Sequence, residues 1–154
     1  MFGNLGRVGW TELAWITPPL LAILAWLPRE ARSLDALLLG EAEAAHLGIA
    51  VESLKRRILL LVVLGTGCAV ALAGLIGFIG LIVPHAVRMI VGPGHRRLLP
   101  ASALAGALLL ILADTAARRI AAPAELPVGV LTALLGTPFF ALLLSRWRRS
   151  VDLP

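Results

Sequence analysis

The stretch AGLIGFIGLIVPHAVRMIVGPGHRRLLP, Ala73–Pro100, decides the fold of this chain. It completes an apolar run, Ile58–Val87, that contains no Asp, Glu, Lys or Arg over 30 residues. One helical crossing of a bilayer needs about 20 apolar residues, so this run is too long for a single crossing. The run is interrupted near its middle by three glycines, Gly74, Gly77 and Gly80. The pattern predicts a Gly-rich membrane hairpin over residues 58–91, followed by a basic loop at Gly92–Arg97.

The composition indicates a membrane protein. Of 154 residues, 59% are hydrophobic and 15% are charged, and the mean hydropathy is +0.92. Soluble domains carry about 25% charged residues. Further apolar blocks occupy residues 13–27, 98–117 and 127–145. Together with the hairpin, they predict an all-α, polytopic membrane helical bundle of about five transmembrane helices.

The basic residues predict the orientation of the bundle. The net charge is +5, but the Lys and Arg residues lie between apolar blocks, which is typical of membrane loops and argues against nucleic-acid binding. If the blocks alternate in direction, most of the 14 basic residues fall on one side, in residues 29–57, 88–97 and 146–154. The positive-inside rule places that side in the cytoplasm, with the C-terminus inside and the N-terminus outside. An outside N-terminus without an evident signal peptide suggests that helices precede this sequence.

The longest polar stretch, residues 28–57, predicts a short helix outside the membrane. Glu41 and Glu43 follow Gly40, in a first helical turn where carboxylates favour the positive end of the dipole. Gly48 is a natural C-terminal stop. Basic residues then anchor the start of the next apolar block, and these are Lys55, Arg56 and Arg57.

The sequence lacks the residues that disulfide frameworks, metal sites and nucleotide-binding sites require. Cys68 is the single cysteine, so neither a disulfide framework nor a thiolate metal cluster is available. The chain has no H-E-x-x-H zinc motif and no G-x-x-x-x-G-K-[ST] phosphate loop. We therefore expect no enzyme activity, no metal site and no ATP bound by this chain. His85 is either a metal or haem ligand or a hydrogen-bonded structural histidine. No carboxylate or thiol residue lies near it in the sequence to complete a metal site.

Small residues at regular spacing predict either a packing face or a hinge. Small side chains let helices approach closely in a bilayer. Pro84 crowds the carbonyl of Gly80, and a glycine at that place eases the clash. Both interpretations remain open for the same set of residues: Gly74, Gly77, Gly80, Pro84, Gly129 and Gly136.

Two arginines lie on the side where basic residues are scarce. Arg118 follows Asp114 by four residues, so the two can pair along a helix and lower the cost of a charge near lipid. The alternative is that Arg118 or Arg119 is an exposed cation that receives an acidic partner.

The sequence resembles a known family. The run GFIGLIVPHAVRMIVGPGHRRLLPASALAGALLLILAD, Gly77–Asp114, and the later AELPVG and GTPFF segments resemble permease subunits of FecCD/BtuC-like ATP-binding-cassette importers. The resemblance extends from about Gly3 to Arg149. Such permeases carry ferric siderophores, haem or cobalamin across the bacterial inner membrane. They normally have ten transmembrane helices and about twice this length, and the chain resembles helices six to ten, the C-terminal half.

The resemblance implies a transport subunit that works by alternating access. Its implied partners are a cytoplasmic ATPase subunit that binds ATP, a periplasmic or lipid-anchored substrate-binding protein, and a second permease copy in a homodimer or heterodimer, all in contact with membrane lipid. The alternative is a truncated, non-transporting membrane remnant or scaffold. Which of the family's substrates is carried does not follow from the sequence.

The resemblance also implies roles for particular residues. The segment Leu38–Gly48 matches the cytoplasmic coupling helix that docks in a groove of the ATPase subunit. Arg118 matches an external arginine that receives an acidic residue of the binding protein, whereas Arg119 has no such match. The implied ATPase-coupling residues are Leu38, Gly40, Glu41, Glu43, Ala44, Ala45 and Gly48.

Overall fold

The computed structural model describes residues 8–121, 128–134 and 136–138. The elements in chain order are α1 (Trp10–Trp26), the 3-10 turn η2 (Leu27–Glu30), α2 (Ala31–Leu37), α3 (Glu41–His46), α4 (Val51–Ala73), α5 (Ile79–Val91) and α6 (His95–Ala121). A further helix runs over Val128–Pro138. All of these elements are helical, which confirms the predicted all-α class.

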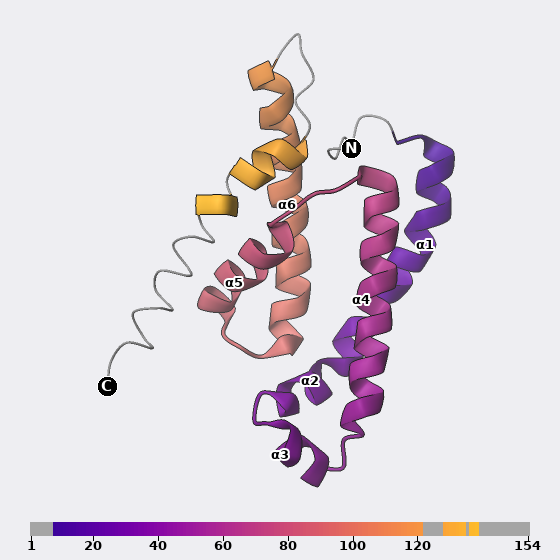
Figure 1. Ribbon diagram of the computed structural model, residues 1–154, viewed down its shortest axis with the longest axis vertical. Coiled ribbons are helices and arrows are strands. Elements are labelled where there is room, and N and C mark those ends of the chain that lie inside the picture. Colours follow the sequence, from indigo (N-terminus) through magenta and orange to yellow (C-terminus); the bar gives the residue numbers. More distant parts are fainter. Residues whose placement is uncertain (1–7, 122–127, 135, 139–154) are drawn as a thin grey trace.

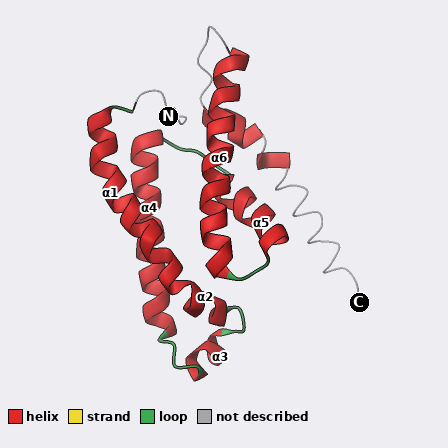
Figure 2. Cartoon of the chain, turned by 180° about the vertical axis from the view of Figure 1, so that it is seen from behind, coloured by secondary structure: helices red, strands yellow, loops and turns green. Residues whose placement is uncertain are grey.

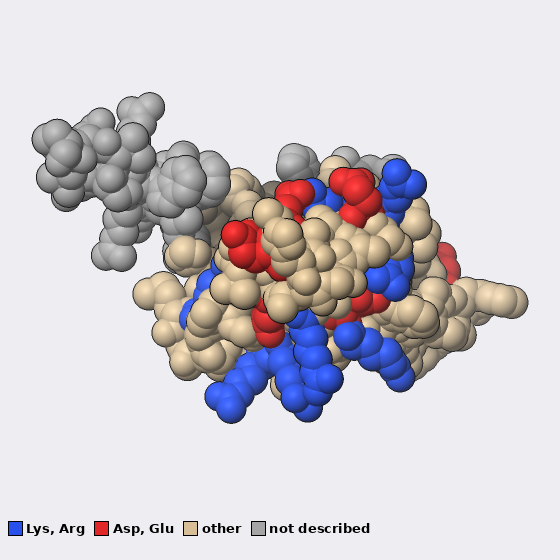
Figure 3. Space-filling view, turned by 90° about the horizontal axis from the view of Figure 1, so that it is seen from below, with Lys and Arg blue, Asp and Glu red and all other residues tan. Residues whose placement is uncertain are grey.

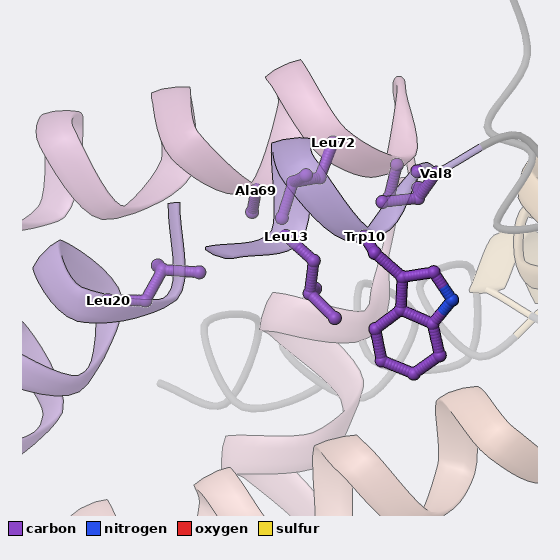
Figure 4. A pocket seen from close by; sticks show the side chains of 8 residues that line it. Val8, Trp10, Leu13, Leu20, Ala69 and Leu72 are labelled. Carbon is purple, nitrogen blue, oxygen red and sulfur yellow. The ribbon is translucent and has the colours of Figure 1, made fainter. Parts of the chain in front are cut away.

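The long helices form two pairs. Figures 1 and 2 show α1 beside α4 and α5 beside α6, with α2 and α3 below them at one end. The α5–α6 pair has a buried core of Val83, Val87 and Leu98. Beside the α1–α4 pair lies an open apolar pocket of about 450 Å³, lined by side chains such as Leu13, Leu20 and Leu72 (Figure 4).

Three of the described helical segments are long and apolar enough to cross a membrane: Trp10–Leu37, Val51–Ala73 and His95–Ile120. The structure differs from the predicted hairpin over residues 58–91, because α5 has only 13 residues. Its length of about 20 Å is less than the roughly 30 Å of the hydrocarbon core. In addition, α5 packs against α6 and not mainly against α4. The apolar content of the sequence predicted helix α5, but it did not indicate that α5 would pack mainly against α6.

The predicted interruption lies at residues 74–78. Gly74 ends α4 with φ +71°, and its N–H donates to the Val70 carbonyl at 2.9 Å. Phe78 precedes α5 with φ +67°, the one positive φ of a non-glycine residue in the described ranges. In one continuous helix, Gly74, Gly77 and Gly80 would lie on the same face. Because the chain is not helical between α4 and α5, these glycines do not share a helical face. Gly74 ends α4, Gly77 lies in the connection and Gly80 lies in the first turn of α5.

Parts of the chain distant in sequence surround this interruption. Gly136, in the Val128–Pro138 helix, is buried against Phe78, and a Cβ added to Gly136 would overlap the Phe78 side chain. A cavity of about 360 Å³ adjoins the connection and is lined by residues of α4, α5 and α6, including Gly74, Ile76 and Leu110. By contrast, a Cβ added to Gly77 or Gly80 would meet no described atom within 4 Å. Close packing is thus seen at Gly136, and at Gly77 and Gly80 it stays a prediction.

We expect Gly136→Ala to lower the free energy of unfolding by about 1–3 kcal/mol, because the added methyl overpacks the contact with Phe78. Thermal unfolding of the detergent-purified chain measures this change. The matched control is Gly77→Ala, whose methyl enters open space and should leave the unfolding temperature nearly unchanged. Equal unfolding temperatures for Gly136→Ala and the unaltered chain would contradict the close contact.

Candidate functional site

The charged end of the molecule is built by α2, α3 and the start of α4. Viewed from this end, Lys and Arg side chains extend together from one side, and Asp and Glu lie among and opposite them (Figure 3). Two glycines with positive φ bound α3: Gly40 at +120° before it and Gly48 at +82° after it. The Gly40 carbonyl accepts the Ala44 N–H at 3.0 Å, which closes the first turn. The predicted short helix outside the apolar spans is thus present, over Glu41–His46.

Apolar burial holds α3 in place. Ala44 on α3 and Leu54 on α4 both have 0% exposure, and α3 packs against α2 and α4. Lys55 Nζ lies 2.6 Å from Glu41 Oε2, but both side chains are largely exposed. Exposed ion pairs contribute about 0–1 kcal/mol, so this pair adds little beyond the apolar contacts.

The outer face of this unit is both apolar and acidic. Leu38, Leu39 and Leu47 are each more than half exposed. Glu41, Glu43 and Ala45 are exposed beside them. Apolar side chains rimmed by charge, outside the long apolar helices, are typical of a protein interaction surface. We call this surface, formed by residues 38–48, the coupling surface, after the role that the family resemblance implies for it.

A second contact ties the same end to α6. The Asp35 carboxylate accepts the backbone N–H of His95 at 2.7 Å, and its same oxygen lies 2.8 Å from His95 Nδ1. An ionised carboxylate only accepts hydrogen bonds, so the second contact requires a proton on Nδ1. His95 is the first residue of α6, where backbone N–H groups have no partner within the helix. Hydrogen bonds to a charged group contribute about 1.5–3 kcal/mol, more than an exposed ion pair does.

Glu30 forms a smaller cluster between η2 and α4. It is buried, and its Oε1 lies 3.6 Å from Arg57 Nη1 and 3.4 Å from the donor Trp26 Nε1. Local sequence spacing did not single out Glu30, Asp35 or His95 as interacting residues. Asp35 and His95 are separated by 60 residues, so only the tertiary fold reveals their contact.

The opposite end of α6 presents the predicted arginine. Arg118 Nε donates to Asp114 Oδ2 at 2.8 Å, as the four-residue spacing predicted, and the Arg118 side chain remains 59% exposed. Ala113 and Ala117, on the same helix, are buried against Val128. Asp114 therefore holds Arg118 through its Nε, and the arginine side chain as a whole remains more than half exposed.

The other residues that the sequence singled out lie on α5 and on the helix that starts at Val128. Pro84 lies inside α5, and Gly129 is buried in the helix that starts at Val128. His85 is exposed on α5, and no group of three His, Cys, Asp or Glu residues in the described ranges could hold a metal ion. Of the predicted last block, 127–145, residues 127, 135 and 139–145 lie outside the described residues.

Comparison with known proteins identifies relatives of one kind. A model of the FecCD transport family matches residues 1–146. The chain is 49% identical over 146 residues to the hemin transport system permease protein HmuU of Yersinia pestis, covering 95% of this chain and 44% of that protein. It is 49% identical to the Fe(3+) dicitrate transport system permease protein FecD of Escherichia coli K12, covering 95% and 46%. It is 44% identical to the vitamin B12 import system permease protein BtuC of Vibrio vulnificus, covering 95% and 44%.

A solved structure shares the fold. An inward-facing conformation of a metal-chelate type ABC transporter matches with a TM-score of 0.86 and 37% identity, over 94% of this chain and 46% of that one. The chain thus spans less than half the length of these relatives. The covered fraction does not tell which part of each relative the chain matches. It therefore does not support numbering the helices as six to ten, and that numbering stays a prediction. The relatives are permeases by name, as expected for a transport subunit that is not an enzyme.

The backbone at Gly40 yields a prediction about the coupling surface. Gly40 has φ +120° and ψ 157°, a region that is essentially restricted to glycine, and an added Cβ would crowd the Glu43 carboxylate. We expect Gly40→Ala to cost about 1–3 kcal/mol of folding free energy. Thermal unfolding measures this loss. Gly67→Ala, in the middle of α4 where a Cβ meets no described atom within 4 Å, serves as the control and should show none.

Proposed function

Since the chain belongs to the FecCD transport family, we propose that it is a permease subunit of a bacterial ATP-binding-cassette importer. The observation that carries this proposal is the coupling surface. It places exposed leucines and carboxylates on a small folded unit at the charged end of an apolar helix bundle. A permease needs such a surface, because ATP is bound by a separate subunit and its work must enter the bundle through a protein contact.

The charge distribution supports an orientation in the bacterial inner membrane. The described basic residues other than Arg118 and Arg119 lie toward the end that carries α2 and α3, and the positive-inside rule places that end in the cytoplasm. The Arg118 end then faces outward. We propose a multi-pass protein whose C-terminus is cytoplasmic.

The proposed mechanism is alternating access. ATP binding closes two cytoplasmic ATPase subunits, and the contact at residues 38–48 passes this motion to the permease. The bundle then switches between outward-open and inward-open states, whose populations depend on differential contacts with the partners. The chain itself performs no covalent step and binds no ATP.

On the outer side, we propose that Arg118 receives an acidic residue of a periplasmic or lipid-anchored substrate-binding protein. The ion pair with Asp114 supports this role, because it restricts the arginine side chain before docking, and that side chain is 59% exposed. An arginine at a docking surface contributes to partner choice through charge complementarity. A second permease copy, identical or related, would complete the translocation pathway.

We propose a substrate of the class carried by the relatives, an iron–siderophore, haem or cobalamin compound. Their names specify hemin, Fe(3+) dicitrate and vitamin B12. The competing proposal is a truncated, non-transporting remnant or scaffold. The observation in its favour is that the chain spans less than half of each relative. Copurification of an ATPase subunit with the chain favours the importer over the remnant.

We expect the double reversal Glu41→Lys plus Glu43→Lys to abolish copurification of the ATPase subunit, because two carboxylates of the coupling surface become cations. Quantitative pull-down from detergent-solubilised membranes measures this loss. The control is Glu12→Lys, which reverses an exposed acid in the first turn of α1, far from α3 (Figure 1). ATPase recovery that survives the double reversal would count against the assignment of residues 38–48.

We expect Arg118→Glu to weaken docking of the substrate-binding protein by about tenfold or more, since the reversal sets two like charges against each other at the contact, which costs several kcal/mol. Binding of that protein to the chain in nanodiscs measures the effect. Arg119→Glu is the matched control, because the same charge change occurs one residue away. A compensating acid-to-arginine change in the binding protein should restore docking to Arg118→Glu, and unchanged docking of Arg118→Glu would exclude the proposed role.

A further inference from the structure

The coupling surface is connected to the long helices by two different routes. One route leads to α4, through the loop after α3, the buried Leu54 and the exposed Lys55–Glu41 pair. The other leads through α2, which packs against both α3 and α6. Among the described residues, the second route leads to the α5–α6 pair through the packing of α2 on α6, and the polar contact on this route is between Asp35 and His95.

The Asp35–His95 contact is suited to transmit motion. One carboxylate oxygen engages both the first N–H of α6 and the imidazole of the same residue, so displacement or rotation of α2 against α6 would break two hydrogen bonds together. The His95 side chain is only 16% exposed, which limits competition from water. The negative charge also lies at the positive end of the α6 dipole.

Beyond this contact, α6 carries α5 with it. Leu98, one turn after His95, is buried in a cluster with Val83 and Val87 of α5. A densely packed apolar interface of this kind shifts as a unit and does not deform continuously. Motion that reaches His95 is therefore delivered to two helices, including the strained Phe78 at the start of α5.

We propose that Asp35 and His95 are positioning residues for transport, which make α2 and the start of α6 move together so that displacement of the coupling surface by the ATPase reaches the α5–α6 pair. This inference rests on the proposed coupling function. It predicts that breaking the contact separates two events that otherwise occur together: the response of α3 to the ATPase and the response of α6.

Paired spin labels measure the two responses separately. In a Cys68→Ser background, Ala42→Cys with Val63→Cys reports the distance from α3 to α4, and Ala103→Cys with Val63→Cys reports the distance from α6 to α4. All three labelled positions are exposed. Because Ala42 lies within the coupling surface, the distances are measured only on labelled chain that still copurifies with the ATPase subunit. Electron–electron double resonance is recorded in nanodiscs, on the complex that copurifies with the chain, before and after addition of a non-hydrolysable ATP analogue.

When the ATP analogue is added to labelled chain that carries no further substitution, we expect both the α3–α4 distance and the α6–α4 distance to shift. In Asp35→Ala, the α3–α4 distance should keep its shift and the α6–α4 distance should lose most of its own. Asp35→Asn retains an oxygen acceptor for the His95 N–H and should keep more of the α6 shift than Asp35→Ala. The matched control is Lys55→Ala, which removes the exposed ion pair of the other route and should leave the α6 shift intact.

A retained α3 shift shows that a variant is folded and bound to the ATPase, and Asp35→Asn provides the same comparison if Asp35→Ala does not fold. A full α6 shift in Asp35→Ala or Asp35→Asn overturns the inference and leaves the proposed function standing. Absence of the α3 shift in the chain without further changes overturns the coupling function, and this inference with it.

Discussion

The non-helical connection from Gly74 to Phe78 is the constraint on which the arrangement of the described helices depends. Within the hydrocarbon core of a bilayer, an unpaired backbone group costs several kcal/mol, so irregular chain is tolerated there only where protein buries it or where it lines a water-filled cavity. The connection directly follows α4, which is itself long enough to cross a membrane, so it lies at the end of that span. Gly136 covers Phe78, and Gly74 and Ile76 line an open pocket of about 360 Å³. This connection turns the chain away from α4, so that α5 packs on α6 and two helix pairs result.

Local sequence patterns predicted the parts of the fold that depend on local chemistry. The charge-free run had to be interrupted, and the glycines predicted where. The partner of α5 was not predictable from apolar content, since every apolar helix in this chain is a possible neighbour. The positive φ of Phe78 was also missed, because an aromatic residue gives no signal for a conformation that glycine usually adopts. In the structure, the Phe78 side chain lies against Gly136.

At the candidate site too, the local features were predictable from the sequence and the long-range contact was not. Gly40 and Gly48 predicted the limits of α3, and the spacing of Asp114 and Arg118 predicted their ion pair, because both depend on neighbours within one or two helical turns. The Asp35–His95 contact joins residues 60 apart, and no periodicity links them. The family resemblance implied that residues 38–48 would meet an ATPase subunit. It did not indicate how that surface is attached to the rest of the bundle.

The contact between Phe78 and Gly136 has a consequence for biosynthesis. Ribosomes deliver the chain from its N-terminus, so α4, α5 and α6 are all synthesised before the glycine that covers Phe78. Until then Phe78 lacks its native neighbour and is in contact with lipid headgroups, water or the insertion machinery instead. Truncation of the nascent chain before residue 136 would leave it in that state permanently.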